Sequence, residues 1–256
     1  MRRDLARANR TNRVQRMAGD PKLEFEKRIS GGKGDAAVIV PAATVTVLRD
    51  RPAGLETIML RRNSKIAFGG MWVFPGGRVD DDDGDSGDDM DQRARIAAVR
   101  EAMEEASLAI DPAELVWFSH WTPPAVDIRR FSTWFFAARA PESDVRIDDG
   151  EITESQWIRP GDALDKQRRG EIELVPPTFV TLHYLSQHAT VDAALRELGR
   201  GGPRRYVTQI ANSDEGMVAM WQGDAGYETR DPSVEGPRHR LLVSKQGFRF
   251  DDSAVR

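Results

Sequence analysis

The chain has no cysteine and only four histidines among its 256 residues. Without cysteine, it can form no disulfide bond, thiol nucleophile or cysteine-ligated zinc site. The histidines do not show the spacing of a zinc protease motif. They are His120, His183, His188 and His239. The sequence therefore offers neither of these two kinds of zinc site.

An excess of basic residues and a long apolar run are also missing. The net charge is −4, whereas a surface that binds nucleic acid is usually basic. No apolar run approaches the length needed to span a membrane. We therefore expect neither nucleic acid nor a membrane as a partner.

The N-terminal segment is rich in arginine. Residues 1–16 lack the apolar stretch of a secretory signal peptide. Two interpretations stay open, an organelle transit peptide and a plain basic tail, and we favour the tail. The expected location is the cytoplasm.

Composition divides the chain into three parts. Residues 1–35 are polar, basic and glycine-rich, which predicts a flexible tail and linker. Residues 36–170 are strand-rich with few helices, which favours an α/β (α+β) core with a mixed sheet flanked by helices. Residues 171–256 predict a C-terminal elaboration of helices and short strands. We expect it to pack on the core rather than form a separate domain.

The expected elements follow from apolar runs and from proline at the first turn of a helix. The expected strands are residues 36–48, 55–61, 72–74, 114–121, 131–138, 151–158, 206–210, 217–221 and 240–243. The expected helices are one around residue 101, then 160–169, 176–188 and 191–198.

An acidic cluster is the most informative motif. On a helix, Glu101, Glu104 and Glu105 stand at i, i+3 and i+4, so the three carboxylates share one face. Two charges about 5.5 Å apart repel by roughly 3 kcal/mol at an effective dielectric constant near 20. Such a cluster favours a cation, and clustered carboxylate oxygens suit Mg²⁺ or Mn²⁺. A solvated acidic helix face is the alternative.

The segment before the cluster favours the metal site. Residues 72–74 predict a short buried strand, and Pro75, Gly76 and Gly77 are expected to break it sharply. Such a turn exposes backbone carbonyls, and glycine lets another group approach closely.

Strand, turn and acidic helix together resemble the Nudix box, G-x5-E-x7-R-E-U-x-E-E-x-G-U with U aliphatic. Gly77 opens the box in this comparison. The helical half is filled by Arg100, Glu101, Glu104, Glu105 and Leu108. The resemblance covers residues 36–165 and implies a Nudix-type α/β/α sandwich with a mixed β-sheet, extended by the C-terminal elaboration.

The chain departs from this pattern between Gly77 and Arg100. It carries 22 residues there, whereas the box allows 13, so nine are extra and most are acidic. Counted back from Arg100, the middle glutamate of the box falls at Gln92, with Asp91 beside it. In the family that glutamate mainly pairs with the box arginine. Its loss leaves open how Arg100 is held.

A second departure is Ser107, which stands where the box has glycine. A left-handed backbone there would cost a residue other than glycine roughly 1–2 kcal/mol. We therefore expect the helix to end in a different way, before Asp111.

The acidic insert does not match a calcium loop. An EF-hand needs acids at positions 1, 3 and 5, glycine at 6 and glutamate at 12. Placing Gly84 at position 6 puts Val79 at position 1 and Met90 at position 12. We instead expect residues 81–91 to form a solvated, flexible loop.

The family resemblance implies that water attacks a diphosphate bridge with the help of Mg²⁺ or Mn²⁺. It implies that Glu101, Glu104, Glu105 and the Gly76 carbonyl hold the metal, while Gly77 and Arg100 are structural. The proton acceptor would be one of these glutamates, Glu154 or Glu151. For the last two, a role as solvent-facing residues of an edge strand stays open.

Softer motifs are similar to the coenzyme A diphosphatase branch: residues 60–64, 68–80 and 174–178. They imply a coenzyme A-like or related nucleoside diphosphate derivative as the small-molecule partner. An arginine expected in the coenzyme A signature falls near Ile66 or Ala67. The side chains that could bind phosphate in bidentate fashion are Arg61, Arg62, Arg129 and Arg130.

Three alternatives remain open. ADP-ribose or another nucleotide sugar is the alternative substrate. A Nudix-fold module that binds a ligand without turnover is the alternative from another functional class. A homodimer also stays open.

Overall fold

The computed structural model describes residues 38–63, 68–124, 129–148, 150–244 and 246–254. The predicted N-terminal tail, residues 1–35, lies outside the described residues. So does the side chain of Arg129, although its backbone is described. Among the described residues, no helix is long and apolar enough to cross a membrane.

The larger of two sheets is mixed and has eight strands. Its order is β3-β2-β1-β6-β5-β8, with β4 paired to β1 and β7 paired to β2. β1 runs parallel to β6, and β5 runs parallel to β8. The strands are β1 (Val38–Arg51), β2 (Gly54–Arg62), β3 (Trp72–Val73), β4 (Gly76–Arg78), β5 (Val116–Thr122), β6 (Arg129–Arg139), β7 (Ile152–Ile158) and β8 (Arg204–Val207).

The smaller sheet is antiparallel, with the order β12-β11-β10-β9. It comprises β9 (Gln209–Ser213), β10 (Gly216–Met220), β11 (Arg240–Ser244) and β12 (Gly247–Asp251). The segment predicted as one strand, residues 206–210, is divided at Thr208 between the two sheets. Pro75, Gly76 and Gly77 are predicted to form a turn. Gly76 and Gly77 instead belong, with Arg78, to the short strand β4 against β1.

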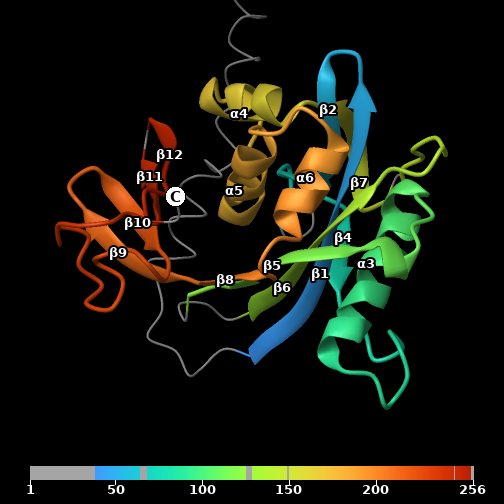
Figure 1. Cartoon of the computed structure of the whole chain (residues 1–256), viewed down its shortest axis with the longest axis horizontal. Coiled ribbons are helices and arrows are strands. Elements are labelled where there is room, and N and C mark those ends of the chain that lie inside the picture. Colours follow the sequence, from blue (N-terminus) through green and yellow to red (C-terminus); the bar gives the residue numbers. More distant parts are fainter. Residues whose placement is uncertain (1–37, 64–67, 125–128, 149, 245, 255–256) are drawn as a thin grey trace, which may run out of the picture.

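Helices cover both faces of the larger sheet (Figure 1). α3 lies on one face, while α4, α5 and α6 lie on the other. They span α3 (Met90–Ala106), α4 (Pro160–Arg168), α5 (Pro176–Leu185) and α6 (Val191–Leu198), with a short 3₁₀ helix at Pro112–Glu114. The predicted α/β sandwich with a mixed sheet is therefore confirmed.

Alanine lines the buried side of α3. Five alanines are fully buried against β1 and β6, where they meet Val45, Val47 and Phe136. Side chains this small let the helix axis approach the sheet closely. The alanines are Ala94, Ala97, Ala98, Ala102 and Ala106.

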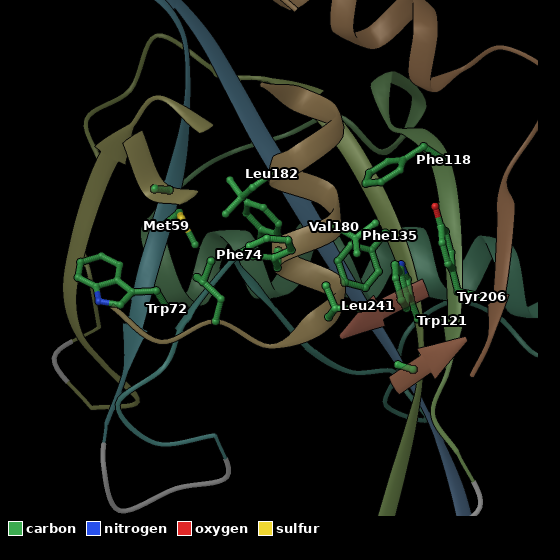
Figure 2. Close-up of a cluster of buried hydrophobic side chains, with 14 of the residues drawn as sticks. Met59, Trp72, Phe74, Phe118, Trp121, Phe135, Val180, Leu182, Tyr206 and Leu241 are labelled. Atoms are coloured by element: carbon green, nitrogen blue, oxygen red, sulfur yellow. The ribbon is translucent and has the colours of Figure 1, made fainter. Parts of the chain in front are cut away.

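Aromatic side chains fill the opposite face (Figure 2). Trp121 of β5 stacks on Tyr206 of β8, with ring centroids 3.9 Å apart. Trp221, which follows β10, meets the Trp121 ring edge-on at 5.4 Å. The same cluster takes in Phe179 of α5 and Leu241 of β11. The larger sheet, α5 and the smaller sheet thus share one apolar core.

Candidate active site

The acidic cluster lies on the last two turns of α3, as the sequence predicts. The Asp89 side chain caps the start of the helix by accepting a hydrogen bond from the Gln92 N–H at 2.9 Å. The helix ends at Ala106 because Ser107 adopts a left-handed backbone with φ of 56°. The expectation that the helix ends in another way is therefore wrong. The Ser107 hydroxyl donates to the Arg146 carbonyl at 3.1 Å.

Glu105 is the buried member of the cluster, with 4% of its surface exposed. Its Oε2 accepts a hydrogen bond from the Gly76 N–H at 2.9 Å, and its Oε1 lies 3.7 Å from Nη1 of Arg62. Burial raises the pKa of Glu105 to about 8. The hydrogen bond from the Gly76 N–H and the positive charge of Arg62 oppose this shift only in part. A carboxylate in this position favours a further cation.

Two glycines allow β4 to run against the acidic helix. A Cβ at Gly77 would overlap the Glu101 carboxylate, and a Cβ at Gly76 would overlap the Ala43 carbonyl. Gly76 also has a φ of 159°. Backbone atoms therefore require glycine at position 76, and a side chain at position 77 would displace the Glu101 carboxylate.

Arg100 bridges the other two glutamates. Its Nη1 donates to Oε1 of Glu101 at 2.9 Å and to Oε2 of Glu104 at 3.0 Å. Burial raises the pKa of Glu101, although the hydrogen bond and charge of Arg100 oppose the shift. Glu104 is the most exposed of the three, with 58% of its side chain accessible.

Asp83 holds the other edge of the Arg100 guanidinium. Nε and Nη2 of Arg100 each donate to one oxygen of Asp83 at 2.9 Å, which is the bidentate geometry of a strong ion pair. Burial alone would raise the pKa of Asp83, but the hydrogen bonds from Arg100 and from the Asp80 N–H hold it below its usual value. The same pairing raises the pKa of Arg100.

The acidic insert is partly buried and well connected. Asp83 is only 2% exposed, and Arg93 donates to the backbone carbonyls of Asp80 and Asp83. Asp89 caps α3, which begins at Met90. The prediction of a solvated, flexible loop over residues 81–91 is therefore wrong for its two ends. Arg93 and Arg100, seven residues apart on one side of α3, hold the insert against the helix.

The late glutamates lie on opposite faces of the larger sheet. Arg62 lies on the α3 face and donates to Glu151 at 3.0 Å, while Arg61 pairs with Glu154 across β2 and β7. Arg61 and Glu154 line a cavity of about 430 Å³ on the face of α4, together with Trp72 and Lys166. Arg61 and Arg62 are successive residues of β2 and point to opposite faces. Arg62 therefore holds Glu151 beside the acidic cluster, whereas Arg61 holds Glu154 on the other face.

The remaining predicted arginines lie at the start of β6. Arg130 is aligned with Ile39 of β1, and its Nη1 is 3.5 Å from the Pro123 carbonyl. Arg129 precedes it, opposite Val38.

Residues 39–177 match the family model described as the NUDIX domain, which is more than half of the chain. The chain belongs to the Nudix family. The predicted family resemblance is thereby confirmed.

Two curated Nudix relatives match part of the chain. The Xenopus laevis protein named acyl-coenzyme A diphosphatase NUDT19 is 28% identical over 137 residues, covering 50% of this chain and 36% of that protein. The Caenorhabditis elegans protein named putative nudix hydrolase 7 is 28% identical over 169 residues, covering 52% of this chain and 56% of that protein. The chain thus spans less than two thirds of the length of either relative.

A solved structure supports the fold. The NUDIX hydrolase from Alicyclobacillus acidocaldarius superposes with a TM-score of 0.57 and 22% sequence identity. The superposition covers 62% of this chain and 96% of that one. The likeness extends to the fold alone.

The middle position of the Nudix box is occupied by Asp83 rather than Gln92. Counted forward from Gly77, the box glutamate falls six residues later, at position 83. The nine extra residues therefore lie after this position, between Asp83 and Arg100. Gln92 is exposed, and its neighbour Asp91 accepts a hydrogen bond from Trp134 at 2.8 Å. Counting from the glycine end of the box is the sequence signal that identifies Asp83.

Glu101, Glu104 and Glu105 carry the oxygen ligands that a divalent metal ion needs. In this structure, however, their carboxylates are hydrogen-bonded to Arg100 and to the Gly76 N–H. No three histidine, aspartate or glutamate side chains of the described residues are grouped to hold a metal ion. Arg100 and the Gly76 N–H take up the carboxylate oxygens instead. Carboxylate oxygen is nevertheless the ligand type that Mg²⁺ and Mn²⁺ prefer, and buried Glu105 lacks full charge compensation. The donor set therefore fits such an ion in its chemistry.

Proposed function

We propose that this chain is a metal-dependent Nudix hydrolase that cleaves the diphosphate bond of coenzyme A, an acyl-coenzyme A or a related nucleoside diphosphate derivative. The observation that carries the proposal is the buried Glu105 carboxylate. It lies beside Glu101 at the Gly76–Gly77 strand of a chain that belongs to the Nudix family. The name of the Xenopus laevis relative supports the substrate class, as do the motifs at residues 60–64, 68–80 and 174–178.

In this proposal Glu101, Glu104, Glu105 and the Gly76 carbonyl hold Mg²⁺ or Mn²⁺. When bound, the ion would neutralise phosphate oxygens and lower the pKa of a water molecule. Gly77 lets Glu101 lie against β4, and Asp83 fixes Arg100 beside the cluster. The residues of the chain thus preorganise negative charge for the ion.

Glu151 is the proposed proton acceptor. The oxygen of the attacking water forms a bond to one phosphorus atom, and the bond from that phosphorus to the bridging oxygen breaks. The water proton passes to a carboxylate, and two phosphate monoesters leave. Glu151 is favoured over Glu154 because it lies on the α3 face and shares Arg62 with Glu105.

Two of the four candidate arginines are proposed to contact the substrate phosphates. Arg129 and Arg130 remain the proposed phosphate contacts, as the sequence predicts. Arg62 pairs with two carboxylates and Arg61 with Glu154. Arg130→Ala is expected to raise KM with little change in kcat, because it would remove binding shared by substrate and transition state.

A hydrolysis screen tests the proposal. Coenzyme A, acyl-coenzyme A, ADP-ribose, NADH and diadenosine polyphosphates are each incubated with Mg²⁺, and the phosphate monoesters are separated and quantified. We expect the coenzyme A compounds to give 4′-phosphopantetheine derivatives and adenosine 3′,5′-bisphosphate. Chelator and the Glu105→Gln variant are the controls. No Mg²⁺-dependent product from any of these compounds would contradict the proposal, and preference for ADP-ribose would redirect the substrate class.

A further inference from the structure

Arg62 occupies a rigid position at the end of β2. Its N–H donates to the Met71 carbonyl at 3.1 Å, and its own carbonyl accepts from the Gly70 N–H at 2.9 Å. Only 17% of its side chain is exposed. The backbone therefore supplies a fixed base from which the guanidinium reaches the acidic cluster.

The guanidinium of Arg62 bridges two carboxylates from different elements. Nη1 lies 3.7 Å from Oε1 of Glu105 on α3, and Nη2 donates to Oε2 of Glu151 at 3.0 Å. Nε is buried and makes no hydrogen bond within the described part of the chain. The contacts of this group are thus directed at the two acids.

Glu151 has a fixed backbone and an exposed side chain. Its N–H donates to Oδ2 of Asp148 at 2.9 Å, and its carbonyl accepts from the Asn63 N–H at 2.7 Å. The side chain is 61% exposed. A solvent-exposed glutamate samples several rotamers, so the Arg62 contact selects the one that points toward α3.

We infer that Arg62 is a positioning residue: its guanidinium ties the carboxylate of Glu151 to Glu105 and so keeps the proton acceptor beside the acidic face of α3. The inference rests on the proposed function. It replaces the phosphate contact that the sequence predicts for Arg62. A residue that acts through Glu151 affects turnover, whereas a phosphate contact affects substrate binding.

The same bridge places a positive charge next to a proposed metal ligand. Like charges repel, so the Arg62 cation opposes the binding of a second cation at Glu105. Removal of the Arg62 charge is therefore expected to have two opposite effects. Metal binding becomes tighter, while turnover becomes slower because Glu151 is released.

The test compares Arg62→Met with Arg49→Met. Both changes remove one arginine of the larger sheet that pairs with a glutamate, but Arg49 pairs with Glu56 across β1 and β2 and has no place in the proposed machinery. For Arg62→Met we expect kcat to fall at least about tenfold with KM within about twofold, since only the transition state loses an interaction. Mn²⁺ titration followed by electron paramagnetic resonance should show binding about threefold to tenfold tighter. Arg49→Met should match the wild type in all three quantities.

A double-mutant cycle separates positioning from general damage. Glu151→Gln should lower kcat about a hundredfold, because it removes the proposed proton acceptor. Arg62→Met combined with Glu151→Gln should be no slower than Glu151→Gln alone, since the two residues act as one unit. If Arg62→Met does not fold, Arg62→Lys replaces it, with an intermediate loss of kcat because one ammonium group cannot bridge both acids as the planar fork does.

Specific results would overturn the inference. A raised KM with unchanged kcat would make Arg62 a substrate contact. Weaker Mn²⁺ binding together with a lowered melting temperature would indicate a purely structural role. Additive losses in the double mutant would uncouple Arg62 from Glu151. Absence of hydrolysis by the wild type would overturn the proposed function and the inference with it, whereas hydrolysis with normal kcat in Arg62→Met would overturn the inference alone.

Discussion

The two faces of the larger sheet are lined with different kinds of side chain. The α3 face is lined with alanine and ends in buried or partly buried carboxylates, while the opposite face is filled by tryptophan, tyrosine and phenylalanine. Small side chains bring a helix close to a sheet, and large rings bury more apolar area. On one face, the close approach of α3 to the sheet positions the charged groups. On the other face, buried aromatic rings join the smaller sheet to the core.

The largest effect is expected from Trp221→Ala on the aromatic face. Trp221 is fully buried and contacts both Trp121 and Tyr206. Its loss should lower the free energy of unfolding by about 3–5 kcal/mol in urea titrations. Trp117→Ala, which removes a half-buried ring on the α3 face, should cost less than half as much. Two separate unfolding transitions, with only the first one shifted by the substitution, would show that the smaller sheet unfolds independently. The aromatic face would then not join the two sheets into one core.

On the α3 face, Glu105→Gln should reduce turnover at least about a hundredfold at saturating Mg²⁺. The amide keeps the shape of the side chain and removes a charge that the proposed metal ion needs. Steady-state kinetics with the best substrate of the screen measures the effect. Turnover close to that of the wild type would remove Glu105 from the site.

The stability of the metal-free chain should depend on pH through Glu105. The pKa of Glu105 is about 8 in the folded chain and 4.5 for the unperturbed group. The folded state therefore holds this proton more tightly, and the resulting stabilisation is complete below the lower value and disappears as the pH rises through the higher one. The free energy of unfolding in chelator should fall by on the order of a few kcal/mol across this window. Glu105→Gln should flatten the profile, and an unchanged slope in that variant would assign the dependence to other groups.

Asp83→Ala should have a smaller effect, lowering kcat about tenfold, because Arg100 loses a buried bidentate partner and can turn fully onto Glu101 and Glu104. Asp83→Glu restores the residue type of the Nudix box and should recover most of the activity. Full activity in Asp83→Ala would mean that the pairing with Glu101 and Glu104 is enough to hold Arg100.

The smallest predicted effect is an increase in stability. Ser107→Gly should raise the free energy of unfolding by about 0.5–1 kcal/mol, because glycine adopts the left-handed backbone without strain. The gain is partly offset by the loss of the hydroxyl bond to Arg146. Ser107→Ala keeps the strain and loses the bond, so it should destabilise the chain. A loss of stability in the glycine variant would show that this hydrogen bond outweighs the backbone strain.

Helical spacing predicted much of the site. The positions of Glu101, Glu104 and Glu105 on one helix face follow from their spacing alone, and the structure places them on α3 beside β4. The motif also predicted the need for glycine at Gly77. Local periodicity was sufficient for these residues because they lie within one regular element and the turn that precedes it.

Long-range pairing explains what the sequence could not predict. Ile152 and Glu154 are two residues apart and would share a face in a regular strand, yet a β-bulge between Arg61 and Arg62 of the paired strand puts them on opposite faces. The division of residues 206–210 at Thr208 depends likewise on which sheet each half joins. Neither the bulge nor the choice of sheet leaves a signal in the hydrophobic pattern.

The insert of the Nudix box is anchored at both ends, with a short hydrogen-bonded turn between them. Asp83 is held by Arg100, and Asp89 starts α3, so residues 84–88 can change in length or composition without moving the acidic cluster. A spectroscopic label attached within this segment would leave the contacts of Asp83 and Asp89 in place.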